Sequence, residues 1–319
     1  MPELRWNPVL EEWVITASAR QDRPIIGKRS SCPFCPGAPE IKKDYDLLVL
    51  KNKFPSFSDM PSRPAVKGSG MYKTASASGI CEVVLYSSDH GSTLSKQSVA
   101  HIERLVSLGK ERTVALEKNR KIKYVFIFEN KGEVIGVSLS HPHGQIYGFP
   151  FIPPRIGKEL ESARRFHGKN HKCLFCEILK TEMKDGRRLV YKNGSFAAFI
   201  PFYARWPYEV HIYPKAHIQS LADFSKTQEK DLAKALKTVL AAYDRLFGFS
   251  LPYMMVVHQR PSGSRFGYYH FHIEFYPPHR ASDKLKYLGG VESGSGTFIN
   301  DSHAEQTAAE LRRAKKEDF

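Results

Sequence analysis

Histidines stand two apart at two places in the chain, and each pair lies in a segment with the pattern of a β-strand. The pairs are His141 with His143 in "SHPHGQIYGFP" and His270 with His272 in "HFHIEFYPP". Residues two apart on a strand point to the same face, so each pair directs two imidazoles toward one side of a sheet. A neutral imidazole serves as a metal ligand or as a nucleophile. The two histidines of a pair therefore need not share one role.

Four of the five cysteines form two CxxC pairs. They are Cys32 with Cys35 and Cys173 with Cys176. The N-terminal segment lacks the apolar core of a secretion signal, so we expect a protein that is not exported. In such a protein, CxxC pairs favour metal or redox chemistry over structural disulfides. Cys81 stands alone in an apolar segment and is expected to be a small buried hydrophobic residue.

The chain repeats itself with a shift of 141 residues, which is the distance between the two CxxC pairs. The same shift aligns Leu48–Asn52 with Leu189–Asn193. Further along, His90 and His217 each close a strand-like segment and precede a long amphipathic segment. An apolar run and a His-x-His pair follow in both halves. Several matches in the same order predict an internal duplication.

Each half is predicted to contain several strands, one long helix and a final His-x-His strand. The helices are expected at about 95–116 and 226–246, where apolar residues recur every three or four positions. Because short connections join the strands, most pairings are expected to be antiparallel in an α+β fold. We place the boundary near Gly168, with a first domain of residues 1–167 and a second of residues 168–319 that ends in a surface helix.

The repeated order of two cysteines and two histidines predicts a structural zinc site in each half. Zinc binds four donors at the corners of a tetrahedron, and one CxxC turn supplies two thiolates. The predicted ligands are Cys32, Cys35, His90 and His141 in the first half and Cys173, Cys176, His217 and His270 in the second. Four protein ligands leave no open position, so neither zinc would be catalytic. The alternative is that the thiols are idle and the histidines merely lie nearby.

If His141 binds zinc, His143 is left beside a rigid support and can attack a phosphorus atom. Gln145 lies on the same face and can donate to a phosphoryl oxygen, and the glycine between them lets a ligand approach the backbone. The alternative is that His143 is an ordinary hydrogen-bonded histidine. In the second half the equivalent residues are His272 and Glu274, and a glutamate repels phosphate. We therefore expect one active half.

The formal net charge of +15 favours an acidic ligand. Such a charge suits nucleic acid, an anionic membrane or a small phosphorylated substrate. No nucleic-acid-binding motif is recognisable, and the apolar runs at 124–128 and 253–257 are too short to cross a membrane. We expect a cytoplasmic protein that acts on phosphorylated small molecules, with neither nucleic acid nor membrane as a partner.

The motif "HPHGQ" after "FENKG", with "CPFC" and "DHGSTL" before it and "HFHIEFYPP" after it, closely resembles the galactose-1-phosphate uridylyltransferase family of the histidine-triad superfamily. The resemblance covers most of the chain. It implies two histidine-triad-like repeats that form an antiparallel half-barrel flanked by helices, usually in a homodimer. It also implies transfer of UMP from UDP-glucose to galactose 1-phosphate, with His143 as the nucleophile and Gln145 steadying the transferred group.

The resemblance also implies further substrate-binding residues. They are Arg20, Arg23, Asn52, Asn130, Ser138, Lys286 and Glu292. Well-known family members carry a second metal on one glutamate and three histidines, and the matching residues here, with one ligand changed, are Glu159, His258, His272 and Glu274. The second CxxC pair instead resembles a branch that includes ADP-glucose phosphorylases. An adenylyltransferase or phosphorylase acting on ADP-glucose is therefore one alternative, and a non-catalytic, zinc-stabilised nucleotide-binding module is another.

Overall fold

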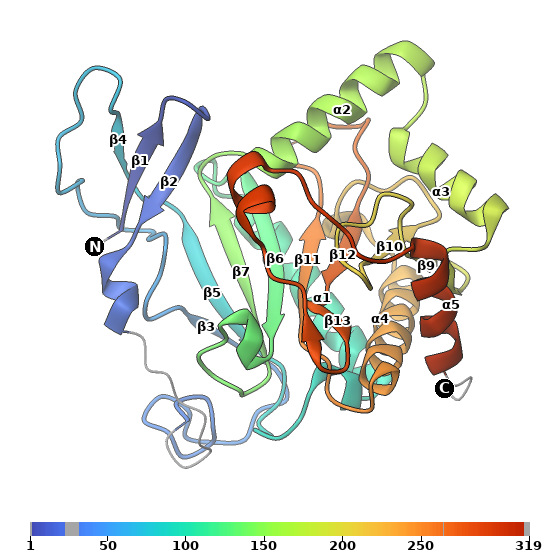
Figure 1. The fold of residues 1–319 in the computed structure, drawn as a ribbon. Helices are drawn as coiled ribbons and strands as arrows, with labels where there is room; N and C mark the ends of the chain where they lie inside the picture. Colours follow the sequence, from blue (N-terminus) through green and yellow to red (C-terminus); the bar gives the residue numbers. More distant parts are fainter. Residues whose placement is uncertain (1, 23–31, 264, 316–319) are drawn as a thin grey trace.

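The computed structural model describes residues 2–22, 32–263 and 265–315, and its centre is one nine-stranded sheet (Figure 1). In spatial order the strands are β3 (Leu48–Lys51), β5 (Ile80–Leu85), β7 (His143–Phe149), β6 (Tyr124–Lys131), β11 (Tyr253–His258), β12 (His272–Tyr276), β10 (Val210–Pro214), β9 (Phe196–Phe199) and β8 (Leu189–Lys192). Each neighbouring pair is antiparallel. The predicted α+β fold with an antiparallel sheet is confirmed.

The internal duplication is visible as a mirrored strand order. The first half supplies β3, β5, β7 and β6, and the second supplies the remaining strands from β11 outward. The halves meet where β6 pairs with β11, for example Ile127 opposite Val257 and Lys131 opposite Tyr253. Each His-x-His strand therefore lies one strand away from the central junction.

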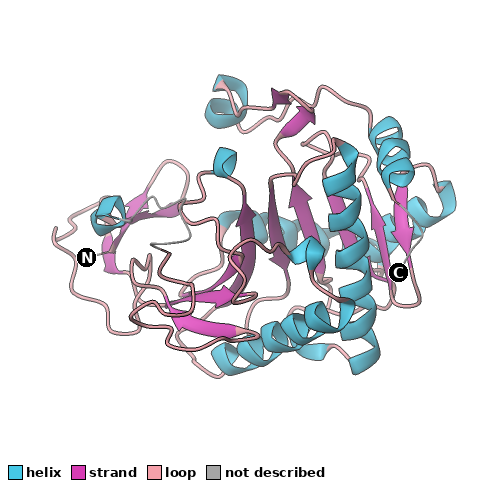
Figure 2. Ribbon diagram, turned by 90° about the horizontal axis from the view of Figure 1, so that it is seen from below, coloured by secondary structure: helices cyan, strands magenta, loops and turns pink. Residues whose placement is uncertain are grey.

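Two long helices cover one face of the sheet, α1 (Val99–Glu117) and α4 (Lys226–Leu246) (Figure 2). The predicted range of the second helix agrees with the observed one, and the first begins a few residues later than expected. Ser225 caps α4 through a reciprocal pair of hydrogen bonds with Gln228, which satisfies backbone donors of the first turn. The apolar side of α4 packs with α1 on β-strand residues in the largest hydrophobic core.

The opposite face is covered by different elements in the two halves. A small sheet of β2 (Glu12–Thr16), β1 (Glu3–Asn7) and β4 (Thr74–Ser76) packs over the first half, where Leu4 contacts the core around Tyr147. Helices α2 (Pro154–Asn170) and α3 (Leu174–Asp185) pack over the second half.

The expectation of one long helix in each half is therefore wrong, because α2 and α3 are additional helices. Only Ile156, Leu160 and Ala163 of α2 are buried, and this narrow apolar stripe lies within a strongly charged segment. The charged residues hid the helical period. Gly168, near which we placed the domain boundary, lies in the last turn of α2, and that boundary stays a prediction.

The C-terminal part returns across the second half. It contains β13 (His279–Ala281), β14 (Lys284–Leu285) and the helix α5 (Ala304–Ala314), which packs against α4 and β8. The single-turn helices are η1 (Ser18–Asp22), η3 (Leu94–Lys96), η4 (Glu133–Ile135), η5 (Leu221–Asp223) and η6 (Val291–Ser295). Among the described residues, none of the helices has both the length and the apolar surface that crossing a membrane requires.

Candidate active site and metal centres

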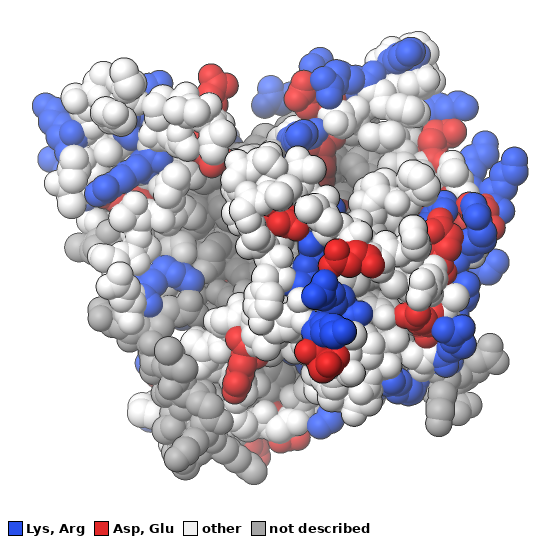
Figure 3. Space-filling model, viewed as in Figure 1, with Lys and Arg blue, Asp and Glu red and all other residues white. Residues whose placement is uncertain are grey.

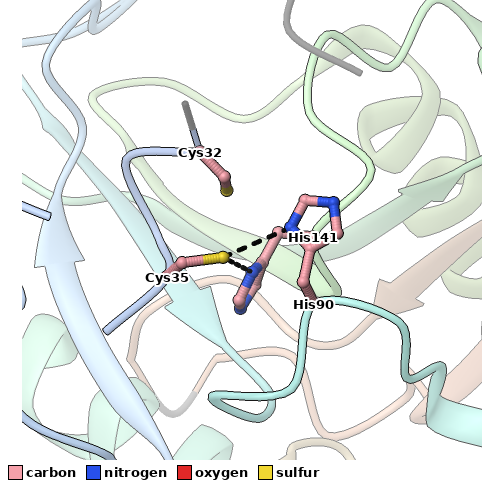
Figure 4. Close-up of side chains that lie close together, drawn as sticks. All are labelled: Cys32, Cys35, His90 and His141. Carbon is pink, nitrogen blue, oxygen red and sulfur yellow. Dashed lines mark hydrogen bonds between the residues drawn. The ribbon is translucent and has the colours of Figure 1, made fainter. Parts of the chain in front are cut away.

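The first CxxC pair and two histidines converge beyond the end of β5 and before the start of β7 (Figure 4). The group consists of Cys32, Cys35, His90 and His141, and its ligand atoms all lie within 4.8 Å of one another. Cys35 Sγ lies 3.4 Å from His90 Nδ1 and 3.6 Å from His141 Nδ1. Segments far apart in the sequence thus place two sulfur and two nitrogen donors around one point.

Hydrogen bonds orient the His141 ring for metal binding. Its Nε2–H donates to the carbonyl oxygen of Ser87 at 2.7 Å, and the Tyr45 oxygen lies 2.7 Å from the same nitrogen. Tyr45 in turn donates to the carbonyl oxygen of Phe34. Burial lowers the pKa of His141 to about 4, so the ring is neutral. The Nδ1 lone pair is therefore directed at the thiols, as in metal sites whose ligands are held by outer partners.

The second half contains the same arrangement. The group consists of Cys173, Cys176, His217 and His270. Cys176 Sγ lies 3.5 Å from Nδ1 of both His217 and His270. The Nε2–H groups of the two rings donate to the carbonyl oxygens of Gly267 and Pro214, respectively. Both groups therefore present two thiols and two preset imidazole nitrogens, a donor set that fits zinc.

A third group lies between the sheet and α2. It consists of Glu159, His258, His272 and Glu274. His258 Nδ1 lies 3.1 Å from Glu159 and 3.2 Å from His272 Nε2. Glu274 accepts a hydrogen bond from Tyr276 and forms an ion pair with Arg205. Because Glu274 is already paired with Arg205 and Tyr276, which lie outside the group, we assign no metal to it.

His143 begins β7 with its ring fixed by one backbone contact. Its Nδ1–H donates to the carbonyl oxygen of His141 at 2.8 Å, which places the lone pair of the neutral ring on Nε2. His272 makes the matching bond to His270 at 3.0 Å, but only 1% of its surface is exposed and His258 lies against its Nε2. The same ring orientation is thus enclosed in the second half and partly exposed in the first.

The partly exposed histidine borders a pocket. His143, Asn130 and Ser138 line a pocket of about 640 Å³ beside the turn between β6 and β7. The surface is also hollowed over β5 and β7, between the small sheet and the larger part of the molecule (Figure 3). These three predicted catalytic or substrate-binding residues, together with the predicted zinc ligand His141, therefore border one space.

A chain of hydrogen bonds connects three more of the predicted residues. The Tyr147 hydroxyl donates to Gln145 Oε1 at 3.3 Å, and Asn52 Nδ2 approaches the same oxygen at 3.5 Å. Arg20 donates to Tyr147 at 3.4 Å and to Ser56 at 3.0 Å. Because the side-chain oxygen of Gln145 accepts these hydrogen bonds, its amide nitrogen is the atom that can donate to a substrate. Tyr147 was given no role from the sequence, although its position four residues after His143 on the same face of the strand was a usable signal.

Lys286 and Glu292 form an ion pair with each other. Their atoms lie 2.9 Å apart, and Lys286 also donates to the carbonyl oxygen of Ile299. This pairing lowers the pKa of Glu292 to about 2. Among the described residues, no hydrogen bond or ion pair is seen between this pair and His143 or Gln145. Arg23, the other predicted substrate-binding residue, lies outside the described residues.

Gly144 is needed for a reason other than the one expected. A side chain at this position would overlap the Tyr86 hydroxyl, and its first carbon would lie 3.0 Å from the Tyr86 ring. Tyr86 approaches from the helix-covered side of the sheet, opposite to His143 and Gln145. The missing side chain therefore makes room for a buried tyrosine, not for a ligand.

Comparisons with known proteins agree with this geometry. Two family models match, described as galactose-1-phosphate uridyl transferase, N-terminal domain, over residues 1–153 and C-terminal domain over residues 159–318. A galactose-1-phosphate uridylyltransferase of Thermotoga maritima is 44% identical over 319 residues, covering 99% of this chain and 100% of that protein.

Two solved structures are similar over nearly the whole chain. One is a uridylyltransferase, with a TM-score of 0.89, 38% identity and coverage of 98% of each chain. The other is an ADP-glucose phosphorylase of Arabidopsis thaliana with bound ADP-glucose, with a TM-score of 0.76, 26% identity and coverage of 98% of each chain.

Proposed function

The chain belongs to the galactose-1-phosphate uridylyltransferase family, and on that premise we propose that it transfers UMP from UDP-glucose to galactose 1-phosphate. The observation that carries the proposal is His143, whose ring is held by one nitrogen while the other carries the lone pair beside a pocket. The enzyme is therefore a nucleotidyltransferase of galactose metabolism.

The reaction proceeds in two displacements at the same phosphorus atom. His143 Nε2 attacks the α-phosphorus of UDP-glucose, and the bond to the bridging oxygen breaks, which releases glucose 1-phosphate. The phosphate oxygen of galactose 1-phosphate then attacks the uridylyl-histidine. The phosphorus–nitrogen bond breaks, and UDP-galactose leaves with His143 restored.

Gln145 stabilises the charge that builds on the non-bridging oxygens during both steps. Its oxygen is held by Tyr147 and Asn52, so its N–H groups are available as preorganised donors. Arg20 supports Tyr147 by donating a hydrogen bond to its hydroxyl. We assign substrate binding to these groups together with Arg23, Asn130, Ser138, Lys286 and Glu292.

Each half holds one structural zinc ion in this proposal. The ligands are Cys32, Cys35, His90 and His141, and Cys173, Cys176, His217 and His270. A bound zinc would fix the loop before β3 against the start of β7 and so hold His143 in place. Cysteines used as thiolate ligands need a reducing compartment, which supports a cytoplasmic location. We further propose that the enzyme is a homodimer, as family membership implies.

A second candidate reaction is phosphorolysis of ADP-glucose. It is supported by the similarity to the Arabidopsis thaliana phosphorylase. It is also supported by Cys173 and Cys176 of the second zinc group, because this CxxC pair resembles the branch that includes ADP-glucose phosphorylases. The same nucleophile would carry AMP, and inorganic phosphate would accept it.

The test is formation of a covalent adduct with one nucleotide sugar alone. The enzyme should release about one equivalent of glucose 1-phosphate per active site from UDP-glucose and retain an acid-labile nucleotidyl group on His143. His143→Gly should form no adduct. His272→Gln, which changes the equivalent residue of the second half, should still form it. An adduct in His143→Gly would disprove the assignment, and a larger burst with ADP-glucose would favour the second candidate.

A further inference from the structure

A buried tyrosine and a buried glutamate lie directly behind the strand that carries His143. Tyr86 follows β5, and its backbone N–H donates to the carbonyl oxygen of Pro142 at 3.1 Å. Its side chain then passes over Gly144, where any larger residue would collide with it. Tyr86 therefore contacts the chain on both sides of His143, once through its backbone and once through its ring.

Glu129 stands next to this tyrosine on β6. It follows Phe128, which pairs with Gln145 across the sheet, and only 3% of its surface is exposed. The Tyr253 hydroxyl donates to Glu129 Oε1 at 3.1 Å. Among the described residues, Oε2 has no hydrogen-bond partner within 3.5 Å, yet the Tyr86 hydroxyl is close enough to influence the carboxyl. Burial raises the pKa of Glu129 to about 7.

A buried polar cluster of this kind lowers the stability of the fold, so its presence points to a function. Burying a carboxyl with one unpaired oxygen is unfavourable, and many of the neighbouring side chains in the sheet are apolar. Lys131 lies above the Tyr253 ring and is paired with Asp244 of α4 at 3.1 Å, so it compensates Glu129 only in part. None of these groups takes part in the two displacements described above.

We propose that Tyr86 and Glu129 are positioning residues for the nucleophile, supporting the β7 backbone at Gly144 so that His143 and Gln145 keep their direction into the cleft. The inference rests on the proposed function. The reason is geometric: His143 and Gln145 flank Gly144, so a shift of the backbone at Gly144 moves both the attacking nitrogen and the amide donor. Misplacement by about 1 Å can reduce the rate of a chemical step by about 100-fold.

The test compares the rate of adduct formation with the affinity for UDP-glucose. Tyr86→Phe removes only a hydroxyl, Glu129→Ala removes the carboxyl, and Glu129→Gln keeps its shape. At saturating UDP-glucose we expect the single-turnover rate to fall about 10-fold to 100-fold in Tyr86→Phe and Glu129→Ala, with less than about a threefold change in the half-saturating concentration. Glu129→Gln should recover most of the rate.

Tyr243→Phe is the matched control. Tyr243 is also a fully buried tyrosine, but its hydroxyl donates to the carbonyl oxygen of Tyr208, just before β10 in the second half. It should lose stability without a change in the single-turnover rate. Rates equal to wild type in both Tyr86→Phe and Glu129→Ala, or an equal loss in Tyr243→Phe, would overturn the inference. If wild-type enzyme forms no adduct, the proposed function itself fails, and the inference fails with it.

Discussion

Replacing Glu129 by glutamine should make the stability of this protein less dependent on pH. Glu129 lies in the interior beside Tyr253 and Tyr86, and burial raises its pKa from 4.5 to about 7. The amide of glutamine has nearly the same shape and can accept the Tyr253 hydroxyl bond, but it cannot ionise. The variant therefore isolates the effect of the buried charge.

The direction follows from the proton affinity of the two states. The folded chain holds the Glu129 proton more tightly than the unfolded chain, so this stabilisation is complete below about pH 4.5 and is lost as the pH rises to about 7. A pKa difference between 4.5 and about 7 corresponds to about 3 kcal/mol. Glu129→Gln should thus be about as stable as wild type at pH 4.5 and about 3 kcal/mol more stable at pH 8.

Calorimetry of both proteins between pH 4.5 and pH 8 measures this difference. Because the entropy of unfolding grows with chain length, about 3 kcal/mol corresponds to a Tm difference of about 5 °C for 319 residues. Glu161→Gln is the control, since Glu161 is exposed on α2 and forms an ion pair with Arg165 at 3.3 Å. That pair should contribute less than about 1 kcal/mol at any pH. A Tm difference between wild type and Glu129→Gln that stays constant across the range would refute the reasoning.

Three further predictions concern the support of the catalytic strand and the zinc ions. Gly144→Ala should destabilise the protein by about 1 to 3 kcal/mol because the new methyl group collides with the Tyr86 hydroxyl, and thermal unfolding should show partial recovery when Tyr86→Phe is added. Tyr45→Phe removes an outer partner of His141 and should weaken zinc binding about 10-fold or more in a competition with a chelator, with no loss expected at the second zinc. Cys176→Ser should reduce the zinc content from about two ions to about one per chain and lower the Tm, and an unchanged content by metal analysis would exclude the second site.

Spacing in the sequence was sufficient to group the residues that the structure brings together at the two CxxC pairs. Cys32 and His141 are more than a hundred residues apart, yet a repeated order of cysteines and histidines links them, because each copy must bring its own members together. The position of His143 two residues after His141 likewise fixes its face on the strand. The fold class followed from the same repeat.

Other features depend on contacts between strands that the sequence does not specify. Tyr86 lies over Gly144 only because β5 and β7 pair in one register, with Leu85 opposite His143. A shift of one residue would turn Tyr86 to the other face. The helix α2 was missed because few of its residues are apolar. The helix α3 is rich in apolar residues, but it is short and begins within the second CxxC pair, which was interpreted only as a metal-binding turn. Lys286 and Glu292 were chosen as separate substrate contacts, but their mutual ion pair could not be foreseen from a spacing of six.

The pairing of β6 with β11 makes each half of the sheet depend on the other half. If the two halves were made as separate chains, each would expose an unpaired edge strand at the place where the other now lies. A single ancestral copy would have needed a second identical copy on that edge, related to it by a two-fold axis. In the present chain both copies are covalently linked, so the partner is always present and the two sequences can differ. In the observed sheet His272 is enclosed whereas His143 is partly exposed, and a mechanism with one active half needs two halves that differ in this way.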